Sequence, residues 1–133
     1  MTPIVEFVVL KREQLGLNQC QLAHRLGVDP SYVNRMESGK KTPGNIKFLE
    51  ELVKALELSH VEAEKFFRLA RMSRHTIKMP IGAPPRAYQL MSNLADEISE
   101  FSETQYKVLE TLLEHFKFEA QQLKRQNCQG ESM

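Results

Sequence analysis

The amino-acid sequence predicts an all-α protein. Residues with high helix propensity (Leu, Glu, Lys, Gln and Ala) are plentiful among its 133 residues, and runs of β-branched residues are scarce. Apolar residues recur at helical spacing in several segments, which glycine, proline or a capping box separates. Because apolar residues make up 41% of the chain, we expect it to bury a core rather than stay disordered.

The first two helices are predicted over Ile4–Leu15 and Gln19–Leu26. Gly16 ends the first helix, and Asn18 is a good N-cap for the second. The expected inward residues are Phe7, Val8, Leu10 (or the stem of Lys11) and Leu15 on the first helix, and Leu22, Ala23 and Leu26 on the second.

The third helix follows a sharp turn at Gly27, which tolerates a positive φ. Asp29 caps the free N–H groups of its first turn, and Pro30 is well suited to the first helical position. We expect this helix to run to about Glu37 with Val33 and Met36 facing inward. Ser38–Gly39 ends it, and a basic turn follows at 40–43.

Two further helices complete a predicted domain at residues 1–75. The fourth covers Asn45–Leu56, and its stripe is Ile46, Leu49, Leu52, Val53 and Leu56. The fifth starts at the capping box formed by Ser59 and Glu62 and runs to about Ser73. Three prolines and one glycine then break the pattern over 74–86, and we place a linker at 76–86.

Residues 87–133 predict a helical hairpin with a frayed tail from about Asn127. The first helix of this hairpin, about Ala87–Phe101, collects its apolar residues on one side: Leu90, Met91, Leu94, Ile98 and Phe101. The second begins at a capping box (Ser102 with Gln105) and does the same with Leu109, Leu112, Leu113, Phe116, Ala120 and Leu123. A lone hairpin would leave much of this surface in water, so we expect residues 87–125 to form a homodimer interface centred on Leu94, Ile98, Leu109, Leu113 and Phe116. The alternative is that these helices pack back on the fifth helix and complete the core of a monomer.

Charge is unevenly divided along the chain. Residues 1–86 carry 14 Lys and Arg against 9 Asp and Glu, whereas residues 87–133 carry 4 against 8. A basic first part and an acidic second part suggest that phosphate meets the first part. The two cysteines, Cys20 and Cys128, lie far apart, and no Cys/His cluster has metal-ligand spacing, so we expect free thiols in a reducing compartment. Ile4–Leu10 is too short for a membrane span and lacks the basic flank of a signal peptide.

The most informative stretch runs from Gln19 to Glu37. Ala23 is small where two helices would cross closely, Gly27 supplies the turn, and Val33 would lock the second helix of the pair onto the first. The chain resembles the Cro and lambda-type repressor family, also called the xenobiotic-response-element family. The resemblance also rests on three neighbouring segments: LKREQLGLNQ (10–19), SYVNRMESGKKTP (31–43) and LVKAL (52–56). The resemblance covers about Val9 to Ser73.

This resemblance implies a five-helix DNA-binding domain whose third helix enters the major groove, usually as a dimer on inverted repeats. Base contacts would fall to Ser31, Tyr32, Asn34 and Arg35. The family's buried ion pair maps onto Arg12 and Glu37, and Gln19 maps onto a phosphate-contacting position. Pro30 stands where some relatives place a base-reading Gln, which shifts the readout toward Ser31, Tyr32 and Arg35.

Physical roles follow for the exposed polar residues, each against the alternative of an ordinary solvated helix face. Arg35 can donate two hydrogen bonds to guanine, and Asn34 can present a donor and an acceptor to adenine. Lys40 and Lys41 are expected to meet a phosphate strand, and Arg25 and Lys11 are further candidates for the backbone. A dimer would place two recognition helices about 34 Å apart, or a multiple of it.

The sequence leaves three classes of function to compare. The first is a sequence-specific regulator of transcription, most simply a repressor, acting on double-stranded DNA in the cytoplasm, at the nucleoid of a bacterium or on phage DNA. The second is an antitoxin or adaptor that uses the same helices to hold a small protein partner. The third is an enzyme, for which the chain offers no triad, carboxylate pair or phosphate loop, and we therefore expect no catalysis and no cofactor.

Overall fold

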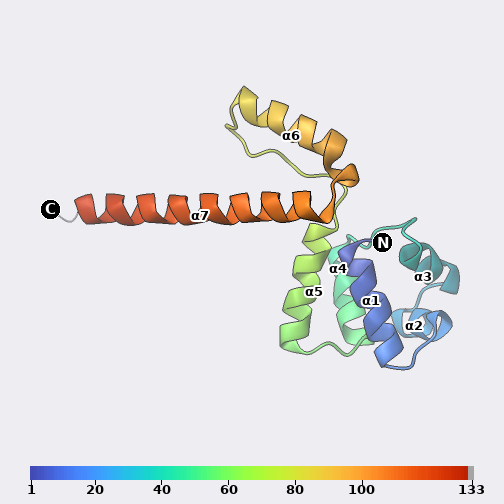
Figure 1. Cartoon of the computed structure of the whole chain (residues 1–133). Helices are drawn as coiled ribbons and strands as arrows, with labels where there is room; N and C mark the ends of the chain where they lie inside the picture. Colours follow the sequence, from blue (N-terminus) through green and yellow to red (C-terminus); the bar gives the residue numbers. More distant parts are fainter. Residues whose placement is uncertain (132–133) are drawn as a thin grey trace. The chain divides into compact units, whose positions relative to one another are not determined.

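The computed structural model describes the backbone of residues 1–131 and the side chains of residues 1–128. Every regular element in that range is helical, so the predicted fold class is confirmed (Figure 1). The chain divides into two compact units, Met1–Lys78 and a second that begins at Met79. The first unit contains α1 (Pro3–Gln14), α2 (Gln19–Leu26), α3 (Pro30–Glu37), α4 (Ile46–Ala55) and α5 (His60–Met72).

Local capping explains where these helices begin. Asn18 forms a capping box with Gln21 at the start of α2, and Ser59 forms one with Glu62 at the start of α5. Asp29 caps α3 by accepting a hydrogen bond from the Ser31 backbone N–H at 2.8 Å. Each cap satisfies an N–H group that the helix itself leaves without a partner, so the chain fixes these boundaries locally.

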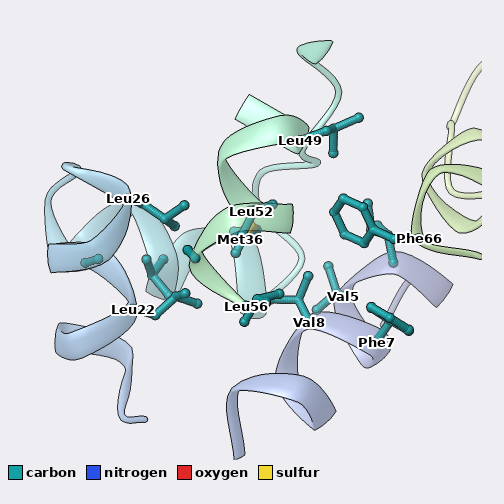
Figure 2. Packing of buried hydrophobic residues seen from close by; sticks show 14 residues of the cluster. Val5, Phe7, Val8, Leu22, Leu26, Met36, Leu49, Leu52, Leu56 and Phe66 are labelled. Carbon is teal, nitrogen blue, oxygen red and sulfur yellow. The ribbon is translucent and has the colours of Figure 1, made fainter. Parts of the chain in front are cut away.

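The core of the first unit lies where all five helices meet (Figure 2). Phe66 of α5 packs against Phe7 of α1 with ring centroids 5.8 Å apart, and both side chains are buried. The other buried apolar side chains are Ile4, Val5, Val8, Leu22, Ala23, Leu26, Val33, Met36, Leu49, Leu52, Ala55 and Leu56. The expected inward residues of α2 and α3 are therefore confirmed.

The predicted stripes of α1 and α4 are wrong in part. Leu10 and Leu15 are 53% and 37% exposed, and the first turn of α1 is buried instead, with Ile4 at 0% and Val5 at 1%. This end of α1 is drawn inward because the Ile4 N–H donates to the buried hydroxyl of Ser73 at 3.0 Å, just after α5. On α4, Ile46 is 67% exposed at the first helical position, and Ala55 is buried at the other end.

The second unit contains α6 (Pro85–Glu97), the 3₁₀ helix η1 (Ile98–Glu100) and α7 (Glu103–Glu131). Helix α6 starts at Pro85, two residues before the predicted start, because proline is favoured at the first helical position. Helix α7 continues past Asn127, where the polar composition predicted fraying. The chain changes direction between η1 and α7 (Figure 1). At this point the Tyr106 hydroxyl donates to the Ile98 carbonyl.

Apolar side chains of α6 and α7 stay largely uncovered within this unit. Leu90 is 66% exposed, and no residue of α6 is classed as buried. The closed hairpin therefore stays a prediction. No helix among the described residues is both long and apolar enough to cross a membrane.

Candidate nucleic-acid interface

Helices α2 and α3 form a rigid pair through small and apolar contacts. Ala23 and Val33 are fully buried, and Gly27 joins the helices with a φ of 69°, in the left-handed region that favours glycine. The Val28 N–H donates to the Ala23 carbonyl at 3.0 Å and fixes the turn. With one side of α3 packed inward, its other side must face solvent.

The outward side of α3 carries the predicted base-contacting residues. Ser31, Asn34 and Arg35 are exposed, and Tyr32 is half-buried. Arg35 forms no ion pair in the described part of the chain. Its guanidinium is therefore free to donate hydrogen bonds to an external acceptor.

Asp29 holds the start of this surface. Hydrogen bonds from the side chain and the backbone of Ser31 lower the pKa of the Asp29 carboxyl, and the nearby charge of Arg35 lowers it further. The carboxylate is thus ionised at neutral pH and caps the α3 N-terminus, where a negative charge is favourable. Ser31 is fixed in place by the same contacts.

A buried hydrogen-bond network lies directly behind α3. Glu37 is 9% exposed and accepts from Arg12 Nε at 2.7 Å and Arg12 Nη2 at 3.1 Å, so the structure pairs the two residues expected to form an ion pair. Gln19 Nε2 donates to the same carboxylate at 2.7 Å. Arg12 Nη1 also donates to the Leu17 carbonyl at 2.8 Å, which ties the α1–α2 turn to the network.

This network reaches the surface through Gln19. Its Oε1 accepts a hydrogen bond from Asn34 Nδ2 at 3.3 Å. The amide of Asn34 is therefore oriented by a chain of contacts that begins at the buried Glu37. The sequence predicted site roles for the four residues of this network, Arg12, Gln19, Asn34 and Glu37. It did not predict the hydrogen bonds that join them, because contacts between helices leave no periodic pattern in the sequence.

Tyr32 supports the basic turn that follows α3. Lys41 Nζ lies 4.4 Å from the centroid of the Tyr32 ring. The Tyr32 ring packs in a T-shaped arrangement with the ring of Phe48 on α4, and the two ring centroids are 5.1 Å apart. The backbone N–H groups of Lys40 and Lys41 both donate to the Arg35 carbonyl, at 2.9 and 3.2 Å. The turn is thus held against the end of α3, with both lysine side chains exposed. The sequence did not predict this role for Phe48, because the residue lies outside the helix-turn-helix motif.

Lys11 and Arg25 are engaged inside the fold. Lys11 pairs with Glu62 across α1 and α5, and this contact is the main cause that lowers the pKa of the Glu62 carboxyl. Arg25 Nη1 donates to the Ala55 carbonyl at 2.9 Å and lies 3.8 Å from Glu57. Through these contacts Lys11 and Arg25 each connect two parts of the fold. If either side chain also bound a phosphate, its positive charge would be shared with the partner that it already has.

The family comparison agrees with this geometry. A family model described as Helix-turn-helix matches residues 10–62, from the second half of α1 to the first turn of α5. Residues 10–62 are a helix-turn-helix of the Cro and lambda-repressor type. These residues are thus similar to the DNA-binding domains of transcriptional regulators of this type. No solved structure matches the chain.

The match ends before α6, so it says nothing about the second unit of the chain. Within the described residues, no group of three or more His, Cys, Asp or Glu side chains is placed to hold a metal ion. The chemistry of the first unit is hydrogen bonding and charge, presented by α3 and the turn after it.

Proposed function

We propose that this regulator binds a specific inverted-repeat operator as a homodimer, with α3 of each copy in the major groove, and acts as a repressor by blocking a promoter. The observation that carries the proposal is the outward side of α3. It is exposed, it holds an arginine that forms no ion pair with any side chain the structure describes, and a buried network supports it from behind.

Base readout centres on Arg35, with Asn34 beside it. Arg35 donates two hydrogen bonds to O6 and N7 of a guanine, which discriminates against a wrong base by about 1–3 kcal/mol. Asn34 presents its amide to an adenine while Gln19 holds it in place. Ser31 and Tyr32 make the remaining contacts at the helix start, where Pro30 offers no hydrogen-bond donor.

Phosphate contacts come chiefly from Lys40 and Lys41. Their backbone position at the end of α3 is fixed, and their side chains are exposed. Gln19 already binds Glu37 and Asn34 through its amide, so it adds at most a weaker contact through its remaining N–H, whereas Lys11 and Arg25 contribute only long-range charge because each has a partner in the fold. These contacts set affinity and salt dependence rather than sequence preference.

The second unit supplies dimerisation. Its uncovered side chains include Leu113 and Phe116, which are 59% and 56% exposed, and burying such surface contributes about 25 cal/mol per Å². Leu94, Ile98 and Leu109 extend the same surface. Two copies joined in this way present two recognition helices to one near-palindromic site. Such a regulator works where the DNA is, in the cytoplasm of a bacterium or on phage DNA.

The same uncovered surface favours a second candidate function. An antitoxin or adaptor of this fold would cover α6 and α7 with a small protein partner rather than with a second copy. The mass of the purified complex separates the two: a particle of two copies of this chain supports the homodimer, and a stable 1:1 complex with a different small protein supports the alternative.

Selection of bound duplexes from random DNA tests the proposal. The parent protein should enrich an inverted repeat with a guanine at one fixed position of each half-site. The Arg35→Ala variant should lose preference at that position, and the matched control Arg68→Ala, exposed on α5, should select the same sequence as the parent. Failure of the parent to enrich any sequence at low salt contradicts the proposal.

A further inference from the structure

Helix α7 carries a regular seam of side chains three and four residues apart. The seam consists of Tyr106, Leu109, Leu113, Phe116, Ala120, Leu123 and Asn127. This spacing is that of the a and d positions of a coiled coil, and it is sustained over three heptads. Leu113, Phe116 and Leu123 are 56–61% exposed in the single chain. A helix of 29 residues with an uncovered apolar stripe needs another helix to cover it.

One flank of the seam carries charges in an ordered sequence. The residues at the e positions, each seven apart, are Glu103, Glu110, Lys117 and Lys124. The flank is thus acidic in the first half of the helix and basic in the second half. Such a flank is complementary to its own reverse, because turning a second copy end over end places lysine beside glutamate.

Resting on the homodimer proposed above, we propose that α7 pairs with α7 of a second copy as an antiparallel coiled coil whose two-fold axis passes between Leu113 and Phe116. Leu113 then faces Phe116 of the second copy, and Leu109 faces Ala120 of the second copy. Tyr106 faces Leu123 of the second copy at each end. The identity of the partner follows from the helix itself, since the seam and the charged flank both match their own reversed copy.

Charge favours this direction over the parallel one. In the antiparallel pair Glu110 lies beside Lys117 of the second copy and Glu103 beside Lys124, which gives four ion pairs by symmetry. In a parallel pair Glu110 would lie beside Gln105 and Lys117 beside Leu112. Of the four charged e positions, only Lys124 would then meet an opposite charge, that of Glu119.

Side-chain volume favours the same direction. The antiparallel pair places each large seam residue against a smaller one, Phe116 against Leu113 and Leu109 against Ala120. A parallel pair would set Phe116 against its own copy and Ala120 against its own copy, crowding one layer and leaving a gap at the other. Mismatched layers of this kind are destabilising in a packed interface.

The arrangement also fixes where the two copies of α7 begin. At a rise of about 1.5 Å per residue, the two Glu103 residues lie about 35 Å apart along the coil.

Disulfide cross-linking in the full chain tests the direction. The background carries Cys20→Ser and Cys128→Ser, which replace two exposed cysteines. In the Leu109→Cys/Ala120→Cys double variant, each new thiol faces one of the second copy, and mild oxidation should yield a covalent dimer. In Ala120→Cys alone the two thiols lie about 16 Å apart, too far for a disulfide, and the chain should stay unlinked. Covalent dimer from Ala120→Cys alone overturns the antiparallel pairing.

Charge reversal measured by analytical ultracentrifugation gives an independent test. Glu110→Lys and Lys117→Glu should each weaken dimerisation about tenfold, and the Glu110→Lys/Lys117→Glu double variant should restore it. Glu114→Lys is the matched control, because position 114 is exposed and lies outside the seam and its flanks. No restoration in the double variant refutes the pairing. A parent that is monomeric at every concentration refutes the homodimer as well, whereas a parent dimer with unaffected single variants refutes only the antiparallel coil.

Discussion

Replacing Glu37 with alanine is the sharpest test of how the recognition helix is supported. The change removes a carboxylate that accepts three hydrogen bonds, two from Arg12 and one from Gln19. The side chains of Arg12 and Glu37 are only 13% and 7% exposed, so the guanidinium is left nearly buried without its counter-charge. Breaking one partner of a buried pair costs about 3–5 kcal/mol.

That cost is a large share of the total stability of about 5–15 kcal/mol expected for a folded domain. With a urea dependence of about 1 kcal/mol per molar for a small domain, the unfolding midpoint should fall by about 3 M or more. Hydrogen exchange resolved by peptide, followed over α2 and α3 at increasing urea, measures this unit separately from the helices of the second unit.

Two comparisons make the Glu37 result decisive. Glu51→Ala, at an exposed position on α4, should leave the midpoint of the same peptides almost unchanged. Arg12→Ala combined with Glu37→Ala should cost less than the sum of the two single changes, because the stranded charge is gone. A Glu37→Ala protein that unfolds at the same urea concentration as the parent would refute the reasoning.

Three further outcomes are expected. Arg35→Ala should weaken binding to a selected operator by about 1–3 kcal/mol in a titration and leave nonspecific binding almost unchanged; an equal loss on both DNAs contradicts a base contact. Lys40→Gln/Lys41→Gln should weaken binding to all duplexes alike and reduce the slope of log affinity against log salt by about 2; an unchanged slope excludes phosphate contacts there. Because the folded pKa of Asp29 is lowered, its carboxylate stabilises α3 at pH values above the ordinary pKa of 3.8, and this contribution is lost as the pH falls through the folded pKa. Urea midpoints should therefore differ between the parent and Asp29→Ala at pH 7 and converge as the pH falls below the folded pKa of Asp29; a difference that persists in acid contradicts the role of the charge.

The helices of the first unit were largely predictable because their signals are local. Asn18, Asp29 and Ser59 cap the helices that sequence reasoning placed after them, and Gly27 has the positive φ expected of the turn. Small errors arose where tertiary contacts decide. Ile4 is buried at the start of α1, where its backbone N–H donates a hydrogen bond to the hydroxyl of Ser73. The two residues are 69 positions apart, so no local pattern reveals this contact.

The candidate site was predictable as a set of residues but not as a set of contacts. The resemblance placed Gln19, Asn34 and Glu37 in three separate roles, yet the structure links them through hydrogen bonds. Lys11 and Arg25 were candidates for phosphate contacts, and the structure gives each a partner within the fold. Residue type predicts that a side chain can bind phosphate, but only the packed helices decide whether its charge is already used.

Methylation interference tests the central claim most directly, because it asks whether α3 touches guanine N7 in the major groove. With the selected operator, methylation of one guanine N7 in each half-site, about one helical turn apart, should block binding of the parent and should have little effect on Arg35→Ala. Equal binding of methylated and unmethylated operator by the parent would contradict the placement of α3 against base edges.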